Sequence, residues 1–212
     1  AAQVCEVKKK STDVMIMGWM EDEETEWAIE NEVEFYVFEI GRLKAAIQFA
    51  EKVGKKAKIH LEVETGMNRT GFEPAEMPRV IELLQDNPDH LAFQGLCTHY
   101  AGAESIANYY RVKKQKITFS KLQKALKLEG LHPVYNHTAC SAAAMRFPTT
   151  RMDMVRIGIL QYGFFPSREV MVDYMARAET KDIPLKRLIS WKSKIMDVKH
   201  VSQLFKSVAA VN

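Results

Sequence analysis

Strand patterns alternate with helix patterns along most of this 212-residue chain. Residues 57–64 alternate apolar and polar side chains, as a half-buried strand does. Residues 41–53 place Leu43, Ala46 and Ala50 on one helical stripe that ends at Gly54. Because only a few residues connect successive patterns, the chain predicts a parallel sheet covered by helices. The predicted strands are 13–18, 34–39, 57–64, 91–101, 134–138 and 152–157, and the predicted helices are 21–31, 41–53, about 74–87, 105–128 and 141–146.

A closed barrel and an open doubly wound sheet both fit this alternation. A dinucleotide-binding doubly wound sheet carries a glycine-rich fingerprint after its first strand, and the sequence has none there. We therefore predict the α/β class and a (β/α)8 barrel. Six strand–helix units do not close eight strands, so the barrel is expected to be incomplete.

The pattern changes after residue 166. Residues 170–184 contain no glycine and are predicted to form an irregular, charged connection. Residues 189–198 alternate at period two and predict a new strand. We assign residues 1–180 to a partial barrel and residues 181–212 to the beginning of a C-terminal β domain.

Composition excludes several classes of protein. A net charge of +3 is too small to favour nucleic acid, and the lysine runs are typical of solvated faces. The sequence contains no run of 18 apolar residues and no secretory leader pattern, which predicts a soluble protein. Cys5, Cys97 and Cys140 are scattered and odd in number, which favours a reducing compartment such as the cytoplasm.

Polar residues follow or end several predicted strands. In a barrel these strand ends face the active site, and charged groups converging there indicate an anionic ligand. Each residue also has a plain structural alternative: a loop arginine is usually on the surface, and a strand histidine is usually a core residue. The residues concerned are Glu62, Glu64, Arg69, His99, Asn136, His137 and Arg156.

Four motifs, in order and spacing, resemble the barrel of alanine racemase, a family of pyridoxal 5'-phosphate (PLP) enzymes with a barrel and a following β domain. They are GMNRTGF at 66–72, GLCTHYAGAES at 95–105, NHTACSAAAM at 136–145 and DMVRIGILQYGFFPS at 153–167. Residues 186–199 are similar to the start of that β domain. The resemblance covers nearly the whole chain and implies interconversion of L- and D-alanine.

The resemblance assigns Arg69 to the phenolic oxygen of the cofactor and to the substrate carboxylate. A guanidinium suits both groups, since it is a permanently charged fork of donors. Glu62 stands where many members carry a lysine that is carbamylated. A glutamate supplies the negative charge directly, and we expect it within ion-pair distance of Arg69.

Arg156 corresponds to the arginine that faces the ring nitrogen of the cofactor. It does not give up its proton, so the ring nitrogen stays unprotonated and the ring is a weaker electron sink. His137 corresponds to the histidine that braces this arginine, and His99 to one near the ring. We expect Arg69, His99 and Arg156 to act in catalysis, with no metal ion.

The phosphate group is assigned to Ser141, Gly158 and Ile159. A hydroxyl and backbone N–H groups at a strand–helix junction can receive a dianion. A helix N-cap is the structural alternative for Ser141, and we expect both roles together. Cys140 stands where many members have asparagine.

Racemisation in this family needs a lysine that holds the cofactor covalently and a tyrosine from the partner subunit. Neither has a counterpart in these 212 residues, so we expect an internal fragment that is inactive alone and binds PLP weakly. A homodimer is implied for the complete form. The alternatives are a serine or lysine racemase, a non-catalytic PLP-binding barrel, and a pseudoenzyme with a scaffold role.

Overall fold

The computed structural model describes residues 1–178 and 182–200. Five parallel strands form one sheet in the order β1-β2-β3-β4-β5. The strands are β1 (Met15–Ile16), β2 (Glu34–Val37), β3 (Ala57–Glu62), β4 (Leu91–Cys97) and β5 (Tyr135–His137). The helices are α1 (Ala2–Val7), α2 (Asp22–Glu30), α3 (Ile40–Val53), α4 (Met77–Asp86), α5 (Tyr109–Leu128), α6 (Ser141–Arg146) and α7 (Arg168–Arg177), with short 3₁₀ helices at Pro74–Glu76, Ile106–Asn108, Pro148–Thr150 and Ile159–Tyr162.

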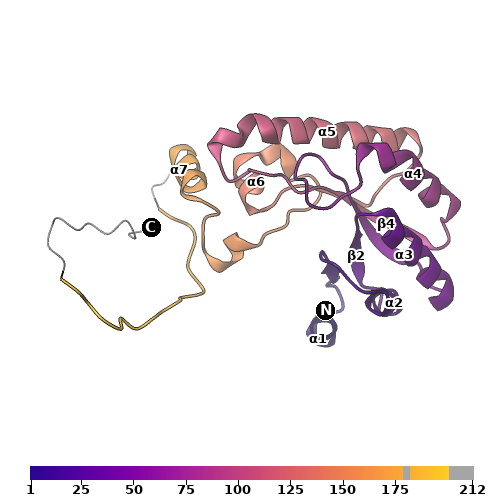
Figure 1. Ribbon diagram of the computed structural model, residues 1–212, viewed down its shortest axis with the longest axis horizontal. Helices are drawn as coiled ribbons and strands as arrows, with labels where there is room; N and C mark the ends of the chain where they lie inside the picture. Colours follow the sequence, from indigo (N-terminus) through magenta and orange to yellow (C-terminus); the bar gives the residue numbers. More distant parts are fainter. Residues whose placement is uncertain (179–181, 201–212) are drawn as a thin grey trace.

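The strand order separates the two folds that the sequence left open. A doubly wound sheet reverses its order at a switch point and carries helices on both faces. Here each strand lies beside its sequence neighbour, and α2 to α5 follow one another around the outside of the sheet (Figure 1). The architecture is part of a β/α barrel, as predicted.

Local sequence explains where the helices begin and end. The Glu39 side chain accepts the backbone N–H groups of Gly41 and Arg42 at the start of α3. Gly54 ends that helix in the left-handed region, with φ +71°, which costs glycine little. Glu21 and Glu24 form a reciprocal capping box at the start of α2. The predicted helix at 21–31 and the predicted end at Gly54 are confirmed.

Two apolar clusters hold the structure together. The larger joins the strands to α2, α3, α4 and α5 and includes Phe35, Ile59, Leu96 and Phe119, all fully buried. The smaller lies around α6 and α7 and includes Val112 and Val170. Within the described ranges, no helix is both long and apolar enough to cross a bilayer.

The predicted sixth strand at 152–157 is wrong. Met152 has φ +47°, which a regular strand cannot include. The Asp153 carboxylate then accepts the backbone N–H of Asn136 at 2.7 Å and ties the segment to β5. A single parallel bridge between Cys140 and Arg156 remains. The segment therefore reaches the sheet as a loop.

The expected irregular connection at 170–184 is also wrong in its first half, which forms α7. The Ser167 hydroxyl accepts the Val170 N–H at 3.1 Å and caps this helix, and Glu169 lies in its first turn.

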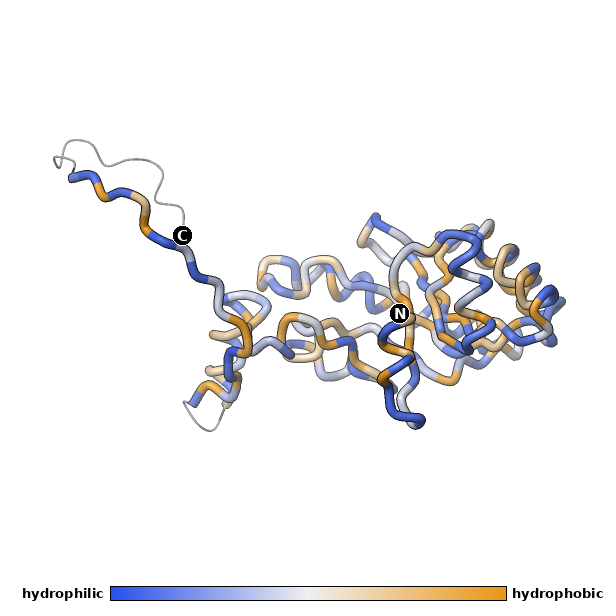
Figure 2. The backbone as a smooth tube through the Cα atoms, turned by 90° about the horizontal axis from the view of Figure 1, so that it is seen from below, coloured by the Kyte–Doolittle hydropathy of each residue, from blue (hydrophilic) through white to orange (hydrophobic). Residues whose placement is uncertain are grey.

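Residues 189–198 are exposed and pair with no described residue. A β-strand forms only when it pairs with another strand, so this segment is not a strand in the described structure. Figure 2 shows this segment leaving the body of the molecule. Residues 179–181 and 201–212 lie outside the described residues, so the domain boundary at 180/181 and the β-domain assignment stay predictions.

Candidate functional site

An open cleft of about 1020 Å³ lies at the carboxyl ends of the strands. Side chains from the strand ends line one part of it, and the loop at 154–159 lines another. Six of the predicted site residues reach this cleft: Arg69, His99, Ser141, Arg156, Gly158 and Ile159. His137 does not, because it is fully buried behind Arg156.

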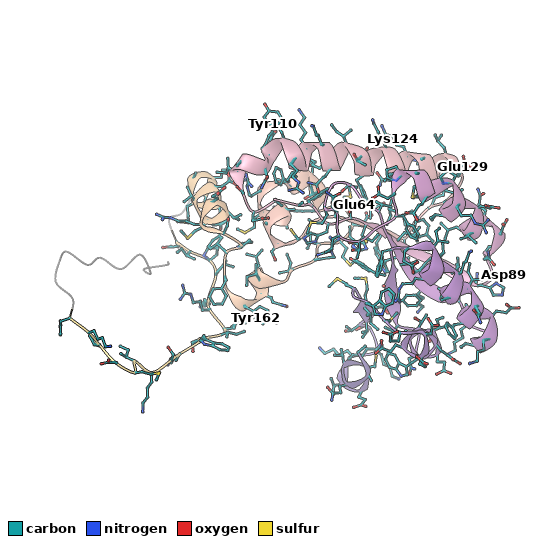
Figure 3. All side chains as sticks on the ribbon, viewed as in Figure 1. Glu64, Asp89, Tyr110, Lys124, Glu129 and Tyr162 are labelled. Atoms are coloured by element: carbon teal, nitrogen blue, oxygen red, sulfur yellow. The ribbon has the colours of Figure 1, made fainter. Side chains whose placement is uncertain are left out.

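The loop that presents Arg69 is organised by Glu64. Its carboxylate accepts the backbone N–H groups of Gly66, Met67 at 2.7 Å, Asn68 at 2.9 Å and Arg69 at 3.4 Å. Figure 3 labels Glu64 in the interior of the molecule, beneath α5. One buried carboxylate therefore satisfies four donors that a tight loop leaves without backbone partners.

Glu62 forms the ion pair that the sequence predicted. Its Oε1 lies 3.6 Å from Arg69 Nη2, and its Oε2 accepts the Thr70 hydroxyl at 2.7 Å. Burial raises the pKa of the Glu62 carboxyl above its usual range, while Thr70 and Arg69 oppose that shift. Arg69 keeps about half of its side chain exposed in the cleft, so its remaining donors are available to a ligand.

Arg156 is held by four contacts. Its Nη1 donates to His137 Nδ1 at 2.8 Å and to the His137 carbonyl at 2.6 Å. Its Nη2 donates to the carbonyls of Thr98 at 2.7 Å and Thr138 at 3.3 Å. Arginine has five N–H donors. The fifth, on Nε, has no protein partner among the described residues, so it is the donor left for a ligand.

Behind Arg156, polar contacts continue across the inner face of the sheet. His137 Nε2 lies 2.8 Å from His60 Nδ1, and His60 Nε2 lies 2.8 Å from Glu34 Oε2. Both imidazoles are fully buried. Burial and the Arg156 charge lower the pKa of His137 from 6.5 to about 3, so His137 is neutral at physiological pH.

His99 lies half-buried in the cleft. Burial, then the charges of Arg156 and Arg69, lower its pKa from 6.5 to about 4. Its ring is therefore neutral at physiological pH and adds no third positive charge to the cleft.

Ser141, Gly158 and Ile159 meet at one corner of the cleft. The Ser141 hydroxyl accepts the Gly158 N–H at 3.1 Å. Ser141 is the first residue of α6, and Cys140 occupies the N-cap position, so the N-cap role that we expected for Ser141 beside the phosphate role is wrong. Ile159 begins a 3₁₀ helix, and the first N–H groups of a helix have no partner within it.

Sequence reasoning missed three residues of the site. Tyr36 lines the cleft, and its buried hydroxyl has no oxygen or nitrogen partner in the described structure, only the neighbouring Cys97 thiol. His60 extends the contacts of His137, and Gly95 on β4 makes room for its ring. A glycine inside a strand was the available signal, since it often marks a close approach. No group of three or more His, Cys, Asp or Glu side chains in the described ranges could hold a metal ion.

Comparison with known proteins identifies the family. Residues 2–166 match the family described as alanine racemase, N-terminal domain. The chain belongs to this family. It is 34% identical over 195 residues to the alanine racemase of Clostridium perfringens strain SM101, which covers 90% of this chain and 47% of the relative. Identity to the alanine racemase of Treponema denticola is 38% over 122 residues, or 57% of this chain and 32% of that one.

Solved structures of alanine racemases share the fold. The enzyme of Clostridium difficile 630 in complex with cycloserine superposes with a TM-score of 0.72 at 29% identity, covering 82% of this chain and 48% of that chain. The Bacillus anthracis enzyme with bound L-Ala-P gives 0.70 at 30% identity, covering 82% and 45%. The chain thus spans about half the length of the relatives it matches, and its match to the family lies in the N-terminal domain.

Proposed function

We propose that the protein carrying this chain is an alanine racemase that interconverts L- and D-alanine with PLP. The observation that carries the proposal is the arrangement of Arg156: four of its N–H groups are bound to protein, and one remains for an acceptor in the cleft. Membership of the family supports the reaction.

The residues present fit PLP in two respects. A weakly basic ring nitrogen is an acceptor, and Arg156 offers one donor that it does not lose. A Cβ built at Gly158 would meet nothing within 4 Å, so the Gly158 backbone is open to a ligand on that side. A phosphate group would accept from the Ser141 hydroxyl and the Ile159 N–H, and from the Gly158 N–H once that group leaves the Ser141 oxygen.

When bound, PLP withdraws electrons from the α-carbon of an attached amino acid and makes its proton removable. Three side chains of this chain, Arg69, Arg156 and His99, surround the space that the cofactor and its amino acid would occupy. Arg69, held by Glu62 and by the Glu64 loop, offers donors to anionic oxygens. Arg156 supplies a hydrogen-bond donor that stays protonated. His99 lines the cleft as a neutral ring and adds no charge.

The test is a racemase assay on the protein that carries this chain. L-alanine with PLP is expected to yield D-alanine, detected with D-amino-acid oxidase. Arg156→Lys keeps the charge but loses the fork of donors, so it should lower kcat by at least about tenfold, the value of one charged hydrogen bond. Turnover of serine or lysine in place of alanine would reassign the substrate. PLP binding without turnover of any amino acid would favour a non-catalytic PLP-binding barrel.

The 212-residue polypeptide on its own is predicted to be inactive and to hold PLP weakly. The lysine and tyrosine expected from the family motifs have no counterpart in these residues, and each general acid or base contributes roughly 10²–10⁴ in rate. Borohydride reduction with PLP, followed by mass measurement, tests this. A stoichiometric pyridoxyl-lysine within residues 1–212 would contradict the prediction.

We also propose that the complete protein is a homodimer. The resemblance implies that a partner subunit supplies the tyrosine. Sedimentation of the complete protein measures its mass, and an active monomer would contradict the proposal of a homodimer.

A further inference from the structure

A line of four polar side chains crosses the inner face of the sheet. It starts at Glu34 on β2, passes through His60 on β3 and His137 on β5, and ends at Arg156 in the cleft. We call it the Glu34–Arg156 chain. Both imidazoles are fully buried, and the Glu34 side chain is 13% exposed.

The contact between the two histidines depends on a glycine. β3 and β5 are separated by β4, and strands two apart lie roughly 9–10 Å from each other. His60 pairs with Gly95 on β4, beside a register shift in the β3–β4 ladder. A Cβ built at Gly95 would lie 1.9 Å from His60 Nδ1. The His60 ring therefore occupies the space above Gly95 and so reaches His137 directly.

The two ends of the Glu34–Arg156 chain determine which ring nitrogens carry the protons. A guanidinium only donates, so His137 Nδ1 must accept and carries no proton. The single proton of neutral His137 is then on Nε2 and is donated to His60 Nδ1. His60 carries its own proton on Nε2 and donates it to the Glu34 carboxylate, which only accepts. No other protonation pattern of two neutral rings satisfies all three contacts, and a proton on His60 Nδ1 would leave two donors facing each other.

We infer that Glu34 and His60 are positioning residues: they fix the Nε2–H tautomer of His137, and so hold Arg156 with its Nε–H left for the ligand. With the opposite tautomer, His137 would present Nδ1–H to Arg156 Nη1, and that contact would be lost. The functional consequence rests on the proposed PLP site, whereas the tautomers themselves do not.

A matched pair of substitutions at Glu34 tests the direction of hydrogen-bond donation along the Glu34–Arg156 chain. Glu34→Gln keeps an acceptor oxygen for His60. Glu34→Lys offers only a donor, which requires His60 to carry its proton on Nδ1 and reverses His137 in turn. Long-range ¹H–¹⁵N correlation spectra of the histidine-labelled protein distinguish the two ring tautomers. Wild type and Glu34→Gln should show Nε2–H on both rings, and Glu34→Lys should show Nδ1–H.

PLP affinity, measured by absorbance titration, gives the functional readout. Glu34→Lys should weaken it by about tenfold, the value of one hydrogen bond to a charged group, and Glu34→Gln by less than about threefold. Should the lysine variant not fold, Gly95→Ala displaces the His60 ring, and Glu34→Met removes the acceptor without adding a donor. Both should lose the uniform tautomer.

An Nδ1–H tautomer on either ring of the wild type, or unchanged tautomers in Glu34→Lys and Glu34→Met, would overturn the inference. If every form shows the expected tautomers but none binds PLP, the proposed function fails and the assignment of protons in the chain stands.

Discussion

At the scale of single residues, this cleft combines two arginines with few compensating charges. Glu62 is the carboxylate nearest to Arg69, and it also accepts the Thr70 hydroxyl. The contact with Arg69 is long at 3.6 Å, and Arg69 is about half exposed. Glu62 therefore orients Arg69 without occupying all of its donors, which leaves the guanidinium available to an anionic oxygen.

On the proposed function, replacing Glu62 by glutamine in the protein that carries this chain should raise KM for alanine by about threefold, since partly exposed ion pairs contribute roughly 0.2–1 kcal/mol. PLP loading should be retained, because Ser141, Gly158 and Arg156 do not contact Glu62. Steady-state kinetics and the PLP absorbance of the purified variant measure both quantities. Glu104→Gln, in the same cleft, is the control, and loss of PLP from the Glu62 variant would contradict this division of roles.

Tyr36 carries a buried hydroxyl whose polar neighbour is the buried Cys97 thiol, a weak hydrogen-bond partner that leaves the hydroxyl poorly satisfied, and burial raises its pKa, so it stays a neutral donor. An unsatisfied buried polar group costs about 1–3 kcal/mol. Tyr36→Phe should therefore increase the free energy of unfolding of the ligand-free protein by about 1 kcal/mol in urea denaturation. A decrease would mean that the contact with the Cys97 thiol stabilises the protein by more than burial of the hydroxyl costs.

At the scale of elements, the loop at 65–71 joins the end of β3 to the cleft. Asn68 adopts φ +57° and Gly71 φ +122°, and the Glu64 carboxylate holds the N–H groups of Gly66 to Arg69. Phe72 returns to the sheet by donating its N–H to the Glu62 carbonyl at 2.9 Å. The loop is thus closed on the strand that it leaves, and this closure places Arg69.

Gly71→Ala should disrupt this closure. A Cβ there would lie 2.7 Å from the Glu64 backbone nitrogen and 2.8 Å from the Val63 carbonyl carbon, and the φ value is unfavourable for alanine. We expect a loss of about 1–3 kcal/mol in the free energy of unfolding, the range for local backbone strain. Gly18→Ala is the control, since its Cβ would meet nothing within 4 Å. Equal stability of the two variants in urea would contradict this account.

At the scale of the whole molecule, the curved sheet buries ionisable groups on its inner face. His137 and His99 have pKa values lowered from 6.5 to about 3 and about 4. Between pH 6.5 and these values the unfolded chain binds protons that the folded chain does not. Stability therefore falls as pH is lowered through this window. The raised pKa of Glu62 acts in the opposite direction, because the folded state keeps that proton to a higher pH.

Because two histidines oppose one carboxyl, the free energy of unfolding should decrease as pH is lowered from about 6.5 to 4. Urea denaturation at a series of pH values measures the slope. His99→Asn removes one of the two groups and should make the slope shallower. A flat profile over this range would show that the histidines are not held neutral.

Across the whole molecule, local sequence patterns predicted most strands and the starts and ends of helices. Five of the six predicted barrel strands form, and the ends of α2 and α3 follow from capping residues next to them in sequence. The failures have local physical causes: the left-handed Met152 breaks the expected strand at 152–157, and the Ser167 cap starts a helix where a connection was expected. Residues 189–198 have the strand period but no strand beside them in the described structure.

By itself, the sequence determined the order of strands and helices, the parallel sheet and the loop after β3 that carries Arg69. Periodicity and capping depend on neighbours along the chain, so they can be predicted from it. Only the tertiary structure decided that Glu34, His60 and His137 lie in contact across the sheet, with the His60 ring in the space above Gly95. These contacts join residues up to 77 positions apart. They depend on strand register and side-chain direction, which the backbone sets only when it folds.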